Sequence, residues 1–131
     1  MSWNFTPDRP IYLQLQEHIK LCIVSGQYMP GDKLPTVREL AIEAAVNPNT
    51  MQRALTELER DGLVHAQRTS GRFVTEDTGV IDKIKNELAH ELASAFLEKM
   101  AAIGYSMDDA VALVAKSNTN ALEGRDKHGD S

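Results

Sequence analysis

Residues 47–53 carry a run of hydrogen-bonding side chains that could recognise the edges of nucleic-acid bases. The run reads Asn-Pro-Asn-Thr-Met-Gln-Arg. Asparagine and glutamine amides can make two hydrogen bonds to adenine, and an arginine guanidinium can do so with guanine. A threonine hydroxyl can donate to a phosphate, and its methyl group can contact thymine. On a helix these groups would form one polar face, which in any amphipathic helix is also what faces solvent.

Two short helices and a tight turn are predicted around this run. Thr36 and Glu39 have the spacing of a capping box, which starts a helix at residue 36. After a break, Asn47 is a good N-cap and Pro48 a good first helical residue. An earlier helix is expected to start at Pro10 and to end at a glycine, residue 26. The apolar face of the helix that carries the run would consist of Met51, Ala54, Leu55 and Leu58.

A β-hairpin is predicted to follow the second of these helices. Residues 63–67 and 72–75 have the composition of strands, and residues 68–71, Arg-Thr-Ser-Gly, can turn between them. Residues 33–34 could add one very short strand. Two helices, a tight turn and a hairpin (the wing, residues 63–75) make a winged helix-turn-helix, whose second helix lies in the major groove of DNA. The tip of the wing would run along the DNA backbone or enter the minor groove.

Several ordered motifs resemble the DNA-binding domain of the GntR family of bacterial regulators. They lie within residues 10–75, and the Asn-Pro-Asn-Thr sequence together with the short C-terminal part is similar to the YtrA-like subfamily. The motifs are Pro-Ile-Tyr-Leu-Gln-Leu (10–15), Pro-Gly-Asp-Lys-Leu-Pro-Thr-Val-Arg-Glu-Leu-Ala (30–41), Val-Asn-Pro-Asn-Thr (46–50) and Leu-Glu-Arg-Asp-Gly-Leu (58–63).

The resemblance implies DNA contacts from the first short helix, from the start of the second and from the wing. Arg38 matches an arginine of the family that contacts phosphate or guanine. Lys33 is either a phosphate contact or a free surface charge. Thr69-Ser70 departs from the subfamily, which usually has a glycine first, so the wing tip is expected to turn differently. The predicted DNA-binding residues are Lys33, Arg38, Asn47, Asn49, Thr50, Gln52, Arg53, Arg68, Thr69, Gly71 and Arg72.

The C-terminal part, residues 76–131, is predicted to hold two helices. A helix of about 26 residues and about 39 Å should start near Asp77 and end at Gly104. A last helix should start at Ser106 and run through Val114, with a polar, fraying tail from Ser117. The long helix carries an apolar stripe that consists of Ile81, Ile84, Leu88, Leu92, Phe96, Met100 and Ile103.

This stripe is too long for one small domain to cover, so we expect it to pack against a second copy of the chain. The alternative is that the last helix folds back over it within one chain. The expected organisation is therefore a mainly α fold with a small β-hairpin: a winged helix-turn-helix in residues 1–75 and a two-helix dimerisation region in residues 76–131. The predicted dimer contacts are Leu88, Leu92, Phe96, Met100, Val111 and Val114.

Charge and cysteine content agree with this organisation. The net charge is −5, but residues 1–75 hold eight Lys/Arg and eight Asp/Glu, whereas residues 76–131 hold six and eleven. The acidic excess therefore lies where DNA would not bind. The single cysteine, Cys22, lies in an apolar stripe and reads as an inert buried thiol rather than a redox sensor, which fits a reducing cytoplasm. No apolar run is long enough to span a membrane, and no secretory signal is evident.

Three other function classes are disfavoured. The sequence shows no catalytic or phosphate-binding motif, and no cofactor is expected. Glu87, His90 and Glu91 are neighbours on the long helix, but such a cluster is more often a solvated face than a metal site. An interaction module that has lost DNA binding is supported only by the altered wing, and an architectural DNA binder would need a basic excess that is absent.

The expected function is therefore that of a dimeric cytoplasmic regulator of transcription. Its partners would be a double-stranded DNA operator, a second copy of the chain and, if there is one, a small-molecule effector. The resemblance implies repression of a transporter-type operon by operator occupancy, without identifying the operator or the effector.

Overall fold

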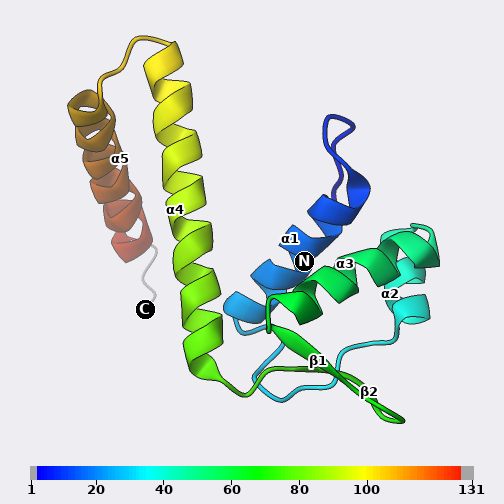
Figure 1. Ribbon diagram of the computed structural model, residues 1–131. Helices are drawn as coiled ribbons and strands as arrows, with labels where there is room; N and C mark the ends of the chain where they lie inside the picture. Colours follow the sequence, from blue (N-terminus) through cyan, green and yellow to red (C-terminus); the bar gives the residue numbers. More distant parts are fainter. Residues whose placement is uncertain (1–2, 128–131) are drawn as a thin grey trace. The chain divides into compact units, whose positions relative to one another are not determined.

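The computed structural model describes residues 3–127, with side chains up to residue 117 (Figure 1). The described part of the chain is mainly helical and contains one two-stranded antiparallel hairpin, as the sequence predicts. The elements are α1 (Ile11–Val24), α2 (Val37–Ala44), α3 (Pro48–Arg60), β1 (Val64–Gln67), β2 (Gly71–Val74), α4 (Thr78–Ala102) and α5 (Met107–Lys127).

The predicted helix caps are confirmed. Thr36 Oγ1 accepts from the Glu39 N–H at 3.1 Å, and Glu39 Oε1 accepts from the Thr36 N–H at 2.8 Å, which completes the capping box of α2. Asn47 Oδ1 accepts from the Asn49 N–H at 2.7 Å at the start of α3. Pro10 differs from its prediction: with ψ at 138° it is the N-cap of α1 and not its first residue.

A buried core joins α1, α2, α3 and the base of the wing. All four residues predicted for the apolar face of α3 are buried completely, and α1 packs against them. Cys22 lies in this core at 2% exposure, and burial raises the pKa of its thiol, in agreement with the prediction of an inert cysteine. The other fully buried large side chains are Leu15, Ile19, Leu40, Leu63, Val64 and Val74.

The wing is fixed to the core at its base and turns through residues 68–70, directly before Gly71. Leu34 donates its N–H to the Arg72 carbonyl at 2.9 Å, so the strand expected at residues 33–34 is reduced to a single bridge between Lys33 and Phe73. At the tip, the Ser70 N–H donates to the Gln67 carbonyl at 3.1 Å, and Gly71 adopts φ +106°. Thr69 does not have a positive φ, because Gly71 supplies that conformation after the turn.

The turn between α2 and α3 contains a strained residue. Ala45 caps α2 with φ 58° and ψ 47°, and it is the one non-glycine of positive φ in the part of the chain that the structure describes. An L-residue in this conformation costs about 1–2 kcal/mol, and glycine does not carry that cost. The hydrogen bonds that the Ala45 N–H donates to carbonyls in the last turn of α2 offset this strain. The left-handed conformation of Ala45 reverses the chain direction, so that α3 starts three residues later.

Ala45→Gly is therefore expected to raise the free energy of unfolding by about 1 kcal/mol, since Ala45 is exposed and loses no packing. Chemical denaturation followed by circular dichroism measures the change. The control is Ala89→Gly at an exposed position inside α4, which should lower stability by about the same amount. A destabilising effect of both glycines would show that Ala45 carries no such strain.

An N-terminal segment lies on α1 and also contacts α2. The Trp3 ring stacks on His18 with centroids 3.9 Å apart, and Trp3 Nε1 donates to Glu43 Oε1 at 3.1 Å. Gln14 Nε2 donates to the Thr6 carbonyl at 2.8 Å, and Gln14 Oε1 accepts from the Thr6 N–H at 2.8 Å. These contacts hold the N-terminal segment against α1, although its sequence predicts neither a helix nor a strand there.

The stacked His18 predicts a loss of stability in acid. Burial lowers the pKa of His18 below its usual 6.5, and the nearby Glu43 carboxylate opposes this shift without reversing it. The unfolded chain therefore takes up a proton on His18 more readily than the folded chain does. The stability that His18 contributes should be complete above pH about 6.5 and be lost as the pH falls through its lower folded-state pKa. Unfolding free energies from pH 8 to pH 5 should fall less steeply for His18→Gln than for the wild type; parallel curves would contradict this.

The chain divides into two compact units, one up to Glu87 and one from Leu88 onward. In the second unit, Gly104 adopts φ +97° two residues after the end of α4, and Ser106 Oγ caps α5 by accepting from the Asp109 N–H at 3.1 Å. The expectation of a tail that frays from Ser117 is wrong up to Lys127, where α5 ends; the last four residues of that tail lie outside the described residues. No proline interrupts residues 115–127, and helix propagation is cheap once the first turn is capped.

Candidate nucleic-acid interface

The exposed face of α3 presents the polar run that the sequence singled out. Asn49, Gln52 and Arg53 are exposed and Thr50 is half-buried, while the apolar residues of the same helix are buried on the opposite side. The helical repeat therefore brings amide, hydroxyl and guanidinium groups onto one surface. This arrangement can offer donors and acceptors to base edges in a major groove.

Asn47 is placed at the start of this surface but serves first as a cap. Its Oδ1 is occupied by the Asn49 N–H at 2.7 Å, which leaves the amide nitrogen free to donate. The N-terminus of α3 also presents backbone N–H groups and a partial positive charge, both of which favour a phosphate. Asn47 is thus better suited to anchor the helix end on the DNA backbone than to pair with a base in two hydrogen bonds.

Thr56 belongs to the same face, although the sequence reasoning did not include it among the candidate contacts. Gln52 Nε2 donates to Thr56 Oγ1 at 3.4 Å, and Thr56 Oγ1 donates to the Gln52 carbonyl at 2.9 Å. The signal was present in the spacing, because residues four apart are neighbours on a helix. Thr56 restrains the side chain of Gln52 next to the other candidate base contacts.

Arg53 lies over an aromatic ring from another helix. The Arg53 Cζ is 3.5 Å from the centroid of the Tyr12 ring in α1. The sequence analysis included Tyr12 only as part of a family motif and did not predict its contact with Arg53. No local pattern links two residues so far apart in the chain. The contact couples the exposed face of α3 to α1.

Arg38 is exposed in the first turn of α2, directly between the two members of the capping box. The cap sets the direction in which this turn leaves the preceding chain. The pKa of Glu39 is lowered because its carboxylate accepts the backbone N–H of Thr36, so the cap stays ionised at neutral pH. Arg38 has no ion-pair partner within the described residues, which leaves its guanidinium available for an external anion.

The wing brings together only some of the residues predicted for it. Arg68 and Thr69 are exposed at the tip. Lys33 lies against Gly71, where an added Cβ would come within 3.1 Å of Lys33 Cε. Arg72 is directed back to the domain, because its Nε donates to Glu59 Oε1 of α3 at 2.5 Å. Arg72 therefore fastens the wing to α3, a role that the sequence did not reveal.

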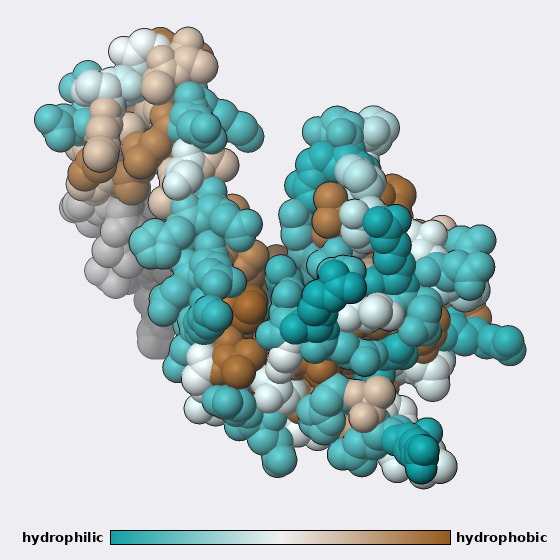
Figure 2. Space-filling view, viewed as in Figure 1, coloured by the Kyte–Doolittle hydropathy of each residue, from teal (hydrophilic) through white to brown (hydrophobic). Residues whose placement is uncertain are grey.

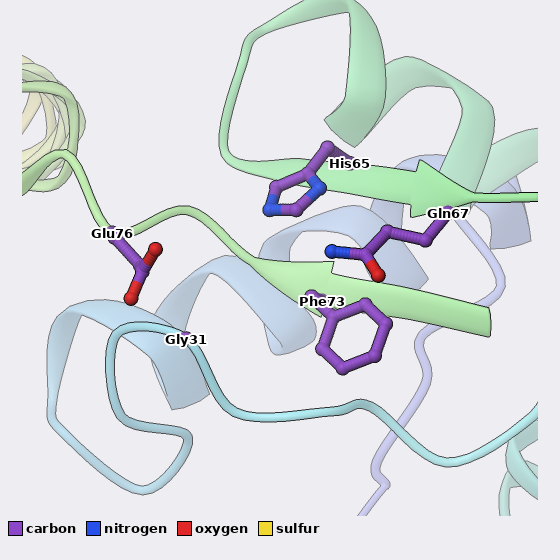
Figure 3. Close-up of a pocket in the computed structure, with 5 residues that line it drawn as sticks. All are labelled: Gly31, His65, Gln67, Phe73 and Glu76. Carbon is purple, nitrogen blue, oxygen red and sulfur yellow. The ribbon is translucent and has the colours of Figure 1, made fainter. Parts of the chain in front are cut away.

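A small hollow of about 240 Å³ lies on the outer side of the wing (Figure 3). His65 and Gln67 project into it from β1 and Phe73 from β2, with Gly31 and Glu76 opposite. The rings of His65 and Phe73, which are cross-strand partners, are 6.1 Å apart. The hollow is open and mostly polar, whereas small-molecule sites are usually enclosed and apolar. It therefore identifies no effector.

The described residues show neither a metal-binding cluster nor a membrane-spanning helix. Glu87, His90 and Glu91 are all exposed on α4, and the described part of the chain holds no group of three His, Cys, Asp or Glu arranged to bind a metal ion. Among the helices described, none is long and apolar enough to cross a bilayer.

Most of the large apolar side chains that are exposed in the described part of the chain belong to the second unit. Figure 2 shows hydrophobic residues gathered around the connection between α4 and α5, in contrast to the mainly hydrophilic surface seen over α1–α3. Leu92 is 71% exposed, Val111 58%, Val114 47% and Phe96 39%, and Leu88 and Met100 are half-buried. These six side chains are exposed or half-buried in the described part of the chain, and their packing against a second copy stays a prediction.

Helix-turn-helix geometry, a hairpin anchored beside it and an exposed polar face on the second helix of the pair define a winged helix-turn-helix protein of the DNA-binding class. Residues 11–74 match the family described as "Bacterial regulatory proteins, gntR family". The chain belongs to the GntR family and is a transcription regulator with a DNA-binding domain.

Relatives with known names support this assignment. The chain is 39% identical over 109 residues to the uncharacterised HTH-type transcriptional regulator YhcF of Bacillus subtilis, covering 83% of this chain and 90% of YhcF. It is 38% identical over 92 residues to the HTH-type transcriptional repressor YtrA of the same organism, covering 66% of this chain and 71% of YtrA. These names are those of regulators of transcription and not of enzymes.

Solved structures agree in fold. A GntR family transcriptional regulator from Listeria monocytogenes superposes with a TM-score of 0.79 at 39% identity, covering 86% of this chain and 98% of that protein. The DNA-binding domain of AraR in complex with operator ORX1 superposes with a TM-score of 0.53 at 29% identity, covering 57% of this chain and 95% of that domain.

Proposed function

We propose that this protein is a homodimeric, sequence-specific repressor that acts by occupying an operator. The observation that carries the proposal is the exposed face of α3, where Asn49, Gln52 and Arg53 lie together on a helix that is already positioned by a buried core. A rigid helix loses little freedom when it enters the major groove, so its contacts contribute directly to affinity and specificity.

The DNA contacts divide by chemistry. The side chains of Asn49, Gln52 and Arg53 read base edges, and Thr50 reads a thymine methyl or a phosphate. Backbone phosphates are bound by positive charges and by the N-terminus of α3. The phosphate contacts that we propose are Lys33, Arg38, Asn47, Arg68, Thr69 and the backbone at Gly71, with Arg72 holding the wing in place.

Residues 76–131 form the dimerisation region in this proposal. The exposed side chains of Leu92, Phe96, Val111 and Val114 and the half-buried Leu88 and Met100 are the contacts. Burial of such apolar surface stabilises association by about 25 cal/mol per Å² before the costs of ordering are subtracted. Two copies of α3 can then read two half-sites, which raises affinity far above that of one domain.

Repression by occupancy follows from this arrangement, since a bound dimer over a promoter excludes RNA polymerase. YtrA is named a repressor, which supports the same direction of control here. The family resemblance favours a cytoplasmic protein whose target is a transporter-type operon. A small-molecule effector would act by changing the spacing of the two recognition helices.

Titration of the purified protein into labelled DNA from upstream of its own gene tests the proposal. Fluorescence anisotropy should show binding that survives excess random duplex and weakens as salt increases, because phosphate contacts release counterions. Equal competition by random duplex would favour an architectural binder. The absence of binding to any DNA by the folded protein would favour an interaction module.

A further inference from the structure

Arg53 is the one base-reading side chain on α3 whose charged group rests on another helix. Its guanidinium carbon lies 3.5 Å from the centroid of the Tyr12 ring, which is the distance of a close cation–π contact. Within the described part of the chain, no carboxylate or carbonyl oxygen accepts a hydrogen bond from Arg53. The ring face is therefore its principal partner.

This contact leaves the hydrogen-bonding edge of the guanidinium free. A guanidinium is planar, and all five of its N–H donors lie in that plane, directed outward. Tyr12 contacts the face of the group, whereas O6 and N7 of guanine would accept from two donors on its edge. Stacking and base recognition thus use different parts of the same side chain and can occur together.

Tyr12 is held firmly enough to act as a platform. It is half-buried in the first turn of α1, two residues before Gln14 and three before Leu15, which are 8% and 0% exposed. α1 makes the most extensive helix–helix contact of the first unit, and that contact is with α3 itself. The ring and the arginine backbone therefore belong to one packed body, so the ring limits the directions that a long, flexible side chain can take.

We propose that Tyr12 is a positioning residue for DNA specificity: its ring holds the guanidinium of Arg53 with the donor edge facing a guanine. The inference rests on the proposed function. An unrestrained arginine would lose rotamer freedom on binding, whereas Arg53 has already lost part of it in the free protein.

A double-mutant cycle on the operator tests this. Tyr12→Leu removes the ring and Tyr12→Phe keeps it, and each is combined with Arg53→Ala. With Arg53 present, we expect Tyr12→Leu to weaken operator binding about two- to five-fold and to flatten the preference at one G·C pair. Tyr12→Phe should match the wild type. In the Arg53→Ala background, neither change should alter affinity. Thermal unfolding of each variant controls for loss of fold.

Equal losses from Tyr12→Leu with and without Arg53 would overturn the proposal, since the tyrosine would then act independently. A loss from Tyr12→Phe equal to that from Tyr12→Leu would overturn it as well, because the hydroxyl would be the active group. Proton NMR of the free protein gives a second reading: the Arg53 side-chain protons should be shifted upfield by the ring in the wild type and in Tyr12→Phe, but not in Tyr12→Leu. If the wild type binds no DNA, the proposed function fails; if it binds and the cycle is additive, only the role of Tyr12 fails.

Discussion

Phe96→Glu is expected to convert the proposed dimer into a monomer and to lower operator affinity by about two orders of magnitude or more. Phe96 is 39% exposed on α4, near other apolar side chains that are exposed in the described part of the chain. A carboxylate at this position would have to lose its hydration in an apolar interface, without a partner charge. In the monomer, the two DNA-binding domains are no longer linked. The second domain is then no longer held at high effective concentration near its half-site.

Sedimentation velocity measures the oligomeric state, and anisotropy measures affinity for whole operator and for one half-site. Ser94→Glu is the matched control, because it adds the same charge at an exposed position two residues away, which a helix places on a different face. The control should remain dimeric and bind normally. A dimeric Phe96→Glu protein, or a monomer that binds the whole operator as tightly as the wild type, would contradict the proposed interface.

Arg38→Ala is expected to weaken operator binding by about 1–3 kcal/mol, roughly 5- to 150-fold, with little change in the free energy of unfolding. Arg38 is exposed and has no described ion-pair partner, so its loss removes no contact that stabilises the fold. Its place in the capped first turn of α2 directs the charge away from the core. If Arg38 contacts phosphate, its loss should weaken binding to all DNA sequences about equally. The slope of the logarithm of the binding constant against the logarithm of the salt concentration should then become shallower by about one.

Arg60→Ala is the matched control for this experiment. It removes the same charge from the C-terminal end of α3, where Arg60 pairs with Glu57 at 3.2 Å on an exposed surface. Its affinity for operator should stay close to that of the wild type. If both variants lose affinity equally, binding depends on net charge alone, and the assignment of Arg38 to the interface is wrong.

Local signals gave the fold because they depend on neighbours in the chain. The Thr36–Glu39 capping box and the Asn47 cap are backbone requirements met within three residues, and both form as predicted. The apolar face of α3 follows from helical spacing alone. The same reasoning failed at the far end of α5, where polar composition predicted fraying although no proline interrupts the helix.

The sequence predicted where the residues of the candidate site lie, but it did not predict which residues of other elements they contact. Its exposed groups on α3 lie where the spacing placed them, whereas the partners of Arg53 and Arg72 come from other elements. Such pairs depend on how helices and hairpin pack, which periodicity does not encode. Trp3 is a similar case, since its hydrogen bond reaches Glu43, 40 residues away.

The wing shows how a departure from a family pattern can be absorbed. Thr69-Ser70 replaced an expected glycine, and a positive φ at Thr69 would have been costly. The chain instead closes the turn with the Ser70 N–H on the Gln67 carbonyl and places the positive φ at Gly71. The tip is thereby formed without strain at Thr69, although its contact with DNA is still a prediction.

The most direct test of a dimeric, sequence-specific DNA reader is selection of bound duplexes from a fully randomised library, followed by sequencing. We predict enrichment of an inverted repeat whose half-sites are centred one or more whole helical turns apart, with a G·C pair in each half-site that is no longer selected in Arg53→Ala. Enrichment of a single half-site would contradict dimeric binding. Recovery of duplexes without any common sequence, by a folded protein, would contradict the central claim.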